Sequence, residues 1–246
     1  MQETLPVLYQ DPDIVVIDKP SGLLVHKSLA DRHENRYAMK ILRNQLGQWV
    51  YPVHRLDKPT SGVLVFALSE HIARGLAEQF QSRQVRKTYL AVVRGRPPLG
   101  GIIDHPIRES AMFKNSVGKF ERKMARESRT LFHRLATVEL QVPVDRYPVT
   151  RYSLLACYPK TGRQHQIRRH LKHIAHPIIG DVRYGKGVHN RFFEREYQLK
   201  RLMLMAKRIE FVHPSSGKPV CVDAGLGNEF QKLIDAFGWV MPAKWC

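Results

Sequence analysis

Runs of apolar residues along the chain predict where its strands lie. Residues 62–67 (GVLVFA) and 87–95 (KTYLAVVRG) are short and almost continuously apolar, which is typical of strands buried on both faces of a sheet. Residues 14–17 (IVVI) and 23–25 (LLV) flank a Lys-Pro-Ser-Gly turn signal, and we expect them to pair as a hairpin. Further strands are expected over residues 150–158 and 199–213.

Apolar residues three and four positions apart predict the helices. This spacing occurs over residues 36–49, 69–80 and 230–237, so each of these segments is expected to bury one face. Ser69 precedes the second of them and is a suitable N-cap. Residues 163–176 are typical of a basic helix that ends before Pro177.

The central part of the chain shows neither the apolar runs of buried strands nor the apolar spacing of helices. Residues 100–146 combine glycine and proline with the basic stretch KNSVGKFERKMARESR, and we expect a mobile insertion that crosses the surface. The predicted strands and helices follow one another without a regular βαβ rhythm. The sequence therefore favours the α+β class over a doubly wound sheet.

The charge of the chain indicates a polyanionic partner. Its 246 residues carry 40 Lys+Arg against 22 Asp+Glu, a formal net charge of +18. Nucleic acid is the first candidate, although solubility or a membrane surface would also explain a basic protein. We expect residues 1–246 to form one compact, monomeric domain.

The three cysteines and the N-terminus indicate the compartment. Cys157, Cys221 and Cys246 form no CxxC pair and no disulfide framework, which fits a reducing cytoplasm. The N-terminus has no signal-peptide pattern, and no apolar run approaches the length of about 18 residues that spans a membrane. We therefore expect a cytoplasmic protein without a membrane partner.

A charged pair lies between two apolar segments in HRLDKPTSG, residues 54–62. Asp57 could simply cap the turn that follows it, with Arg55 as a surface partner. The alternative is a nucleophilic or general-base carboxylate that a guanidinium keeps ionised at the edge of a cleft. Position alone does not decide between the two.

A second basic centre follows in PKTGRQHQIRRHLKH, residues 159–173. It has five cations, and no acidic residue occurs anywhere between Arg146 and Gly180. A solvated helix face usually alternates charges, so this segment is more typical of a surface that follows phosphates.

Metal and cofactor templates are missing from the sequence. The histidines of residues 165–176 lack HExxH spacing and acidic neighbours, and no P-loop or dinucleotide fingerprint occurs. We expect neither a metal nor a cofactor. Tyr89 in KTYLAVV is either a core aromatic residue of a strand or a ring that stacks on a splayed base.

Together these motifs resemble one known family. HRLDKPTSG, preceded by DKPSGLLVH and followed by KTYLAVVRG, PKTGRQHQIRRH and HPIIGD, is similar to the pseudouridine synthases built around an HRLD motif. The resemblance runs from about Leu5 to Trp239. Compared with this family, the chain starts directly at the catalytic region, and we expect no separate N-terminal RNA-binding module. It implies the pseudouridine synthase fold, with a mixed, mostly antiparallel central sheet, flanking helices and a catalytic cleft.

The resemblance also implies a reaction and a target. The chain would convert uridine to pseudouridine in tRNA, at position 65 of the T stem, after flipping the base out of its stack. Asp57 matches the family's essential carboxylate, and Arg55 the arginine that helps to open the nucleotide site. Tyr89 would stack on the uracil and is the candidate to remove its C5 proton. Arg163 would hold Asp57 ionised, with Arg168 as the alternative.

Further residues are expected to contact the RNA. His54 and Thr60 belong to the HRLD motif, and the candidates outside it are Arg168, Arg169 and Lys172 in the basic segment and Lys119 and Lys123 in the insertion. The sequence departs from the pattern at Met205, where we expect His, and at Gln164, where Thr, Ser or Lys is usual. These departures bear on the substrate and leave the reaction type intact.

Three other functions remain as alternatives. The same chemistry could act on 23S ribosomal RNA, because relatives with the HRLD motif use that substrate. The chain could also be a non-catalytic tRNA-binding chaperone, although a pure binder has no need for a carboxylate in a site that accepts phosphates. An aspartate-nucleophile hydrolase lacks a phosphate-cradling loop and metal-binding acids in this sequence.

Overall fold

The computed structural model describes residues 3–27, 33–108, 112–114, 120–122 and 124–241. Its strands are β1 (Val7–Gln10), β2 (Ile14–Lys19), β3 (Tyr51–Pro52), β4 (Ser61–Ala67), β5 (Arg86–Arg94), β6 (Gly100–Asp104), β7 (Met112–Lys114), β8 (Phe120–Arg122), β9 (Arg129–Leu140), β10 (Thr150–Pro159), β11 (Leu204–Val212) and β12 (Pro219–Asp223). Its helices are α1 (Ala38–Leu46), α2 (Glu70–Gln81), α3 (Gln166–His173), α4 (Gly187–Tyr197) and α5 (Gly227–Phe237).

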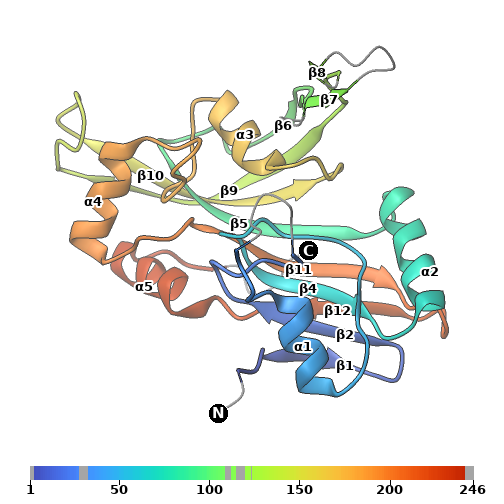
Figure 1. The fold of residues 1–246 in the computed structure, drawn as a ribbon. Helices are drawn as coiled ribbons and strands as arrows, with labels where there is room; N and C mark the ends of the chain where they lie inside the picture. Colours follow the sequence, from blue (N-terminus) through green and yellow to red (C-terminus); the bar gives the residue numbers. More distant parts are fainter. Residues whose placement is uncertain (1–2, 28–32, 109–111, 115–119, 123, 242–246) are drawn as a thin grey trace.

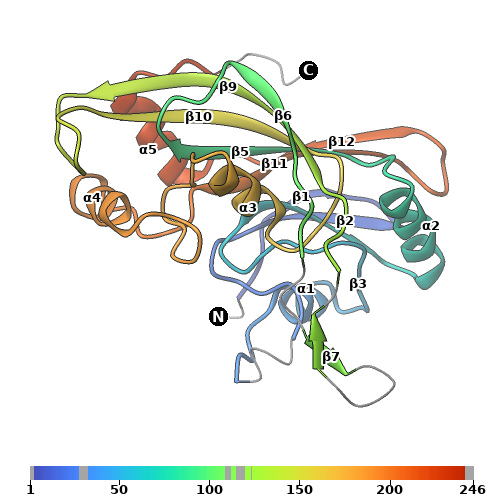
Figure 2. The same ribbon diagram turned by 90° about the horizontal axis from the view of Figure 1, so that it is seen from above.

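One ten-stranded sheet organises these elements. Its main path follows the order β1-β2-β4-β11-β5-β10-β9-β6, with β3 added beside β4 and β12 beside β11 (Figure 1). The pairs along it are antiparallel except for β4 and β11, which run parallel. Helix α2 lies at one end of the strands, and α4 and α5 lie at the other end (Figures 1 and 2). This mixed, mostly antiparallel sheet with flanking helices confirms the predicted α+β class.

The centre of the sheet follows the apolar runs. All seven residues of β4 are buried, because α1 packs on one of its faces through Leu42 and α2 on the other through Leu76. Strand β4 is thus an interior strand, as its continuous apolar sequence predicts. The Ser69 hydroxyl accepts a hydrogen bond from the Ile72 N–H at 3.3 Å, which confirms it as the N-cap of α2.

The predicted hairpin of residues 14–17 with 23–25 is wrong. Strand β2 pairs with β1 on one side and with β4 on the other. The turn after β2 instead contacts the loop before β4, where the Gly22 N–H donates to the carbonyl of Lys58 at 2.9 Å and the Ser21 hydroxyl to that of Pro59 at 2.7 Å. The Pro-Ser-Gly segment therefore braces the loop that carries Asp57.

The predicted surface insertion over residues 100–146 is largely wrong as well. Strands β6 and β9 belong to the main sheet, and β9 pairs with β10 from Thr130 to Leu140. Strands β7 and β8 form a separate two-stranded sheet (Figure 1). Lys119 and Lys123 lie outside the described residues.

The C-terminal elements differ from the sequence prediction mainly in their bounds. Helix α3 begins at Gln166 rather than at Arg163, because His165 has a left-handed backbone conformation with φ of 55°. Helix α4 and strand β12 were not predicted. Helix α5 and strand β11 confirm the predicted helix and strand near the C-terminus.

A glycine sets the position of the loop that precedes β4. Gly62 has φ of 106°, and a Cβ atom there would lie 2.1 Å from the carbonyl oxygen of Ala206 in β11. Only a residue without a side chain permits this close approach of two parallel strands. The glycine of the HRLDKPTSG motif therefore fixes the point at which its loop enters the sheet.

Candidate functional site

A cleft of about 1400 Å³ opens where the loop before β4 meets β5 and the segment that leads into α3. It is lined by seven of the residues that the sequence analysis selected: His54, Arg55, Asp57, Thr60, Tyr89, Arg163 and Arg168. They come from three segments far apart in the chain. The fold therefore assembles the predicted motifs around one cavity.

The Asp57 carboxylate lies in this cleft beside a guanidinium. Its side chain is 19% exposed, and its Oδ2 lies 3.2 Å from Nη1 of Arg168. The Thr60 N–H donates to the backbone carbonyl of Asp57 at 3.0 Å, so a turn holds the loop. The carboxylate is thus accessible from the cleft while its charged partner is buried.

Arg168 is held from behind by a second carboxylate. Its Nε donates to Asp181 Oδ2 at 2.7 Å and its Nη2 to Asp181 Oδ1 at 2.9 Å. Burial by itself would lower the pKa of Arg168, but the hydrogen bonds and charges of Asp181 and Asp57 raise it above its usual value. Arg168 is therefore a fixed cation that joins two acids.

Asp181 is in turn fixed by the backbone of its own turn. The N–H groups of Arg183 and Tyr184 donate to its Oδ1 at 3.0 and 2.9 Å. Burial favours a higher pKa for Asp181, but the Arg168 hydrogen bond and these amides hold its pKa below the usual value. HPIIGD contains this residue, yet the sequence analysis gave it no role.

Arg163 and Arg168 were the two candidates for the partner of Asp57, and the structure places Arg168 within hydrogen-bond distance of it. Arg163 precedes α3, is half-buried, and donates from Nε to the backbone carbonyl of Glu127 at 3.3 Å. Arg168 lies on the first turn of α3, which directs it at Asp57. Arg168, the alternative that the sequence left open, is therefore the candidate with a described contact to Asp57.

His165 completes the surroundings of Asp57. Its Nε2 lies 3.8 Å from Asp57 Oδ1, and its Nδ1 forms a 3.0 Å hydrogen bond with the Tyr184 hydroxyl. Burial lowers the pKa of His165, although the Asp57 carboxylate opposes this shift. The sequence analysis considered this histidine only as a metal ligand. Its left-handed backbone, which brings the ring to Asp57, gives no signal in the sequence.

Tyr89 lies on β5 and lines the cleft with its ring half-buried. Burial raises the pKa of its hydroxyl, and the nearby Asp57 carboxylate raises it further. The phenol therefore stays protonated near neutral pH. A neutral ring beside a carboxylate can stack on an uncharged base and donate a hydrogen bond.

Lys19 supports the Asp57 loop from the interior of the protein. Its side chain is buried, and its Nζ donates to the backbone carbonyls of Pro20, Leu23 and Lys58 at 2.9, 2.7 and 3.2 Å. Burial lowers its pKa to about 7, and the charge of Arg201 lowers it as well. Lys19 belongs to the DKPSGLLVH motif, but the sequence analysis gave it no role.

The remaining predicted contacts occupy varied positions. His54 accepts a hydrogen bond from the Val65 N–H at Nε2 and stacks on Phe80, so its ring holds the loop on β4. Arg55 is exposed in the wall of the cleft. On α3, Arg169 donates to the carbonyl of Arg108 at 2.7 Å, and Lys172 lies over the Tyr184 ring.

The two departures from the family pattern lie in different surroundings. Met205 is buried in β11, where it pairs with Leu90 of β5 and belongs to the core. Gln164 is exposed in the wall of the cleft. Only Gln164 is therefore placed to contact a bound substrate directly.

The described part of the chain contains no group of three or more His, Cys, Asp or Glu residues that could hold a metal ion. Among the same residues, no helix has the length and apolar character needed to cross a membrane.

Comparison with known proteins places this chain in a known family. The family model for RNA pseudouridylate synthases matches residues 13–173, which include both Asp57 and Arg168. Two curated relatives, from Pasteurella multocida and Vibrio cholerae, are each named tRNA pseudouridine synthase C. They are 46% and 44% identical to this chain, and the alignments cover 96% of it and 97% and 96% of the relatives.

Solved structures give the same result. Human RNA pseudouridylate synthase domain containing 4 aligns with a TM-score of 0.72 and 25% identity over 96% of this chain and 94% of its own. Human RNA pseudouridylate synthase domain containing 1 aligns with a TM-score of 0.68 and 26% identity, over 92% of this chain and 84% of its own. By sequence and by fold, this chain belongs to the RNA pseudouridylate synthase family.

Proposed function

We propose that this protein converts uridine to pseudouridine in tRNA, at position 65 of the T stem, with Asp57 as the essential carboxylate. The names of the relatives and their nearly full-length alignment support tRNA as the substrate. One observation carries the catalytic assignment: Asp57 is the acid in the cleft whose oxygen meets a guanidinium that a second acid holds in place.

The reaction is an isomerisation in which atoms and electrons balance within the substrate. The bond from N1 of the uracil to C1′ of the ribose breaks, and a bond from C5 to C1′ forms. One proton leaves C5 and one arrives at N1, so no oxidant, reductant or second substrate enters the balance. The protein must hold the detached base and let it rotate before the new bond forms.

Asp57 acts first in this scheme. Its carboxylate attacks the base or the sugar, or acts on the 2′ side of the ribose, and each route needs an anionic oxygen that faces the nucleotide. Arg168 supplies a positive charge 3.2 Å from that oxygen. An opposite charge at this distance stabilises a carboxylate before and after it reacts.

Tyr89 provides the surface on which the base rests. A flipped base loses its stacking partners in the RNA, and an aromatic ring in the protein restores part of that energy. Because its hydroxyl is a neutral phenol in the free protein, Tyr89 can take the C5 proton only after losing its own. Stacking needs no such step, so the two roles of Tyr89 are separable by experiment.

Arg55 and the cations near the cleft bind the RNA backbone. Arg55 is exposed where the flipped nucleotide would enter, and a guanidinium there can bind the phosphate on either side of it. Arg169 and Lys172 extend the positive charge along α3. The net charge of +18 adds a long-range attraction for tRNA.

The test uses purified protein and an unmodified tRNA transcript, with pseudouridine mapped nucleotide by nucleotide. We expect conversion at position 65 by the native protein and none by Asp57→Asn, which keeps the size of the side chain. Conversion of ribosomal RNA fragments in place of tRNA would move the substrate to ribosomal RNA. If the native protein binds tRNA but modifies neither RNA, the catalytic assignment fails and the chaperone alternative stands.

A further inference from the structure

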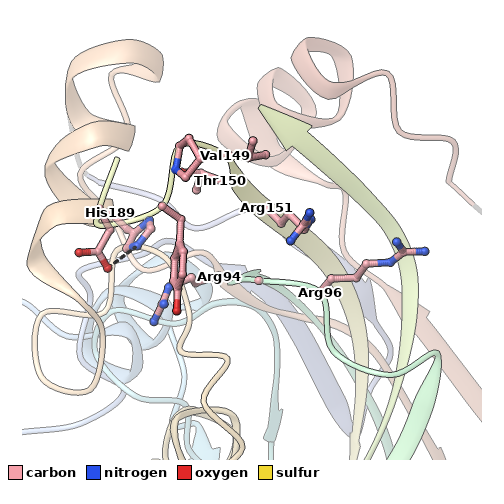
Figure 3. Close-up of a pocket in the computed structure, with 10 residues that line it drawn as sticks. Arg94, Arg96, Val149, Thr150, Arg151 and His189 are labelled. Atoms are coloured by element: carbon pink, nitrogen blue, oxygen red, sulfur yellow. Dashed lines mark ion pairs between the residues drawn. The ribbon is translucent and has the colours of Figure 1, made fainter. Parts of the chain in front are cut away.

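A second cavity lies at the opposite end of β5 and β10 from the Asp57 cleft. It has a volume of about 490 Å³. Arg94 at the end of β5, Arg96 just beyond it, Arg151 on β10 and His189 on α4 contribute to its wall, together with the connection between β9 and β10 (Figure 3). Arg94 lies at the end of the KTYLAVVRG motif, but the proposed chemistry uses none of these residues.

The charge of this cavity is positive and partly uncompensated. Arg151 is paired with Glu139 at 2.6 Å, and the acid in the wall, Asp145, is paired with Lys186. Within the described residues, the guanidinium groups of Arg94 and Arg96 form no ion pair. Two of the three arginines are therefore available to an anion.

A buried ring nitrogen in the wall also lacks a partner. His189 is 2% exposed, and its Nδ1 forms a 2.9 Å hydrogen bond with the Tyr152 hydroxyl. Burial lowers the pKa of His189 to about 4, so its imidazole is neutral near pH 7.

The other ring nitrogen of His189, Nε2, has no hydrogen-bond partner among the described residues, since Asp145 Oδ2 lies 3.9 Å away. Buried polar atoms are almost always satisfied, and a ligand bound in the cavity would satisfy this one. The exposed ring of Tyr147, which Arg146 covers at 4.9 Å, lies beside the same cavity.

We propose that this cavity binds a backbone phosphate of the RNA whose uridine enters the Asp57 cleft. Guanidinium groups match the geometry of phosphate oxygens, and phosphate contacts set the position of a protein on a nucleic acid without reading its sequence. The inference rests on the proposed function, because it takes the same RNA as the ligand.

The two sites are well separated along the sheet. Arg94 in the cavity follows Tyr89 in the cleft by five positions of β5, a distance of about 17 Å along the strand. A phosphate bound in the cavity would therefore belong to a nucleotide other than the one that enters the Asp57 cleft.

The test compares Arg94→Gln combined with Arg96→Gln with the native protein, using an unmodified tRNA transcript. We expect the Kd to rise about tenfold near physiological salt and the slope of log K against log salt to fall by about 1 to 2. KM should rise while kcat changes less than about twofold, because the Asp57 cleft is intact. A merely structural loss would lower kcat as well and leave the salt slope unchanged.

A matched control removes the same charge elsewhere. Arg74→Gln combined with Arg195→Gln neutralises two exposed arginines that are each already paired with a glutamate. If the cavity variant binds tRNA with the affinity and salt slope of this control, the inference is overturned. Arg96→Gln alone changes an exposed side chain and is the safeguard if the double variant fails to fold.

The outcome also separates this inference from the proposed function. Conversion of tRNA by the native protein, with unchanged binding by the cavity variant, refutes the phosphate site alone. Failure of the native protein to convert tRNA refutes the proposed function, and the binding measurement then still decides whether the cavity contacts RNA.

Discussion

Asp181 holds Arg168 by two of its three guanidinium nitrogens and leaves Nη1 directed at Asp57. The Arg168 and Asp181 side chains are 5% and 0% exposed, so neither can relax into water. A flexible cation near Asp57 would have to be ordered during the reaction, whereas this one is ordered beforehand. The rigidity of the site thus depends on an acid that never touches the substrate.

Substitution of Arg168 by Lys tests the value of that geometry. Lysine keeps the positive charge but has one ammonium group in place of a fork, so it cannot hold Asp181 through two nitrogens and reach Asp57 with a third. We expect kcat to fall about 100-fold, the typical effect of displacing a catalytic group by about 1 Å, while the Kd for tRNA changes little. Single-turnover kinetics and a binding titration measure the two effects.

Arg163→Lys is the matched control, because Arg163 lines the same cleft but donates to a backbone carbonyl. This variant should retain kcat within about threefold. A larger loss of kcat for Arg163→Lys than for Arg168→Lys would return Arg163 to the role that the sequence first gave it.

Substitution of Asp181 by Asn tests how much the buried pair of Arg168 and Asp181 contributes to stability. Asparagine can still accept the N–H groups of Arg183 and Tyr184, but it leaves the Arg168 charge only partly compensated. We expect the free energy of unfolding to fall by about 3 kcal/mol, as for other broken buried pairs. Urea denaturation measures this change. The control is Asp223→Asn, which disrupts a more exposed pair with Arg208 and should lower the free energy of unfolding by less than about 1 kcal/mol. Equal losses of unfolding free energy for both variants would show that burial of the Arg168 pair adds nothing to its contribution to stability.

The sequence predicted those strands whose neighbours cover both faces. Strands β4, β5 and β10 carry long buried runs and were located within one or two residues. Strand β9 lies next to the last strand of the sheet and has mostly half-buried positions, so its twelve residues have no clear apolar period. It forms because β10 offers a partner, and that information is not local to its own residues.

The sequence likewise predicts which residues lie in the site but not how they contact one another. The motifs supplied Asp57, Tyr89 and a set of cations, and all three kinds of residue lie in the cleft. Which cation meets Asp57 depends on where α3 begins, and the left-handed conformation of His165 delays its start until Gln166. A sequence pattern cannot give the direction of a side chain when the first turn of its helix is uncertain by three residues.

Tyr89→Phe separates the two roles proposed for this tyrosine. Phenylalanine keeps the ring that stacks on the base and removes the hydroxyl that would accept the C5 proton. We expect unchanged tRNA affinity and a rate of isomerisation lower by about 100-fold or more, the usual contribution of a general base. Tyr89→Leu should also weaken the binding of the flipped base. Full activity of Tyr89→Phe would show that the hydroxyl takes no proton and that the ring only stacks.

The pH dependence of stability provides a test of the loop that carries Asp57. Burial, with a smaller effect from Lys87, lowers the pKa of His54 from 6.5 to about 3, because its Nε2 accepts the Val65 N–H in a desolvated position. The unfolded chain therefore binds a proton at this residue below about pH 6.5, while the folded protein does not until about pH 3. The stability present above pH 6.5 is lost as the pH falls through this window, by about 2 kcal/mol from His54 between pH 7 and pH 5.

The measurement is urea denaturation at several pH values for the native protein and for His54→Gln, whose amide oxygen can accept the same N–H but does not titrate. Between pH 7 and pH 5 the native protein should lose about 2 kcal/mol more than this variant. His71→Gln removes an exposed histidine of α2 and should follow the native curve. If all three proteins lose stability in parallel, His54 is protonated in the folded state, and its hydrogen bond to β4 does not hold the Asp57 loop in place.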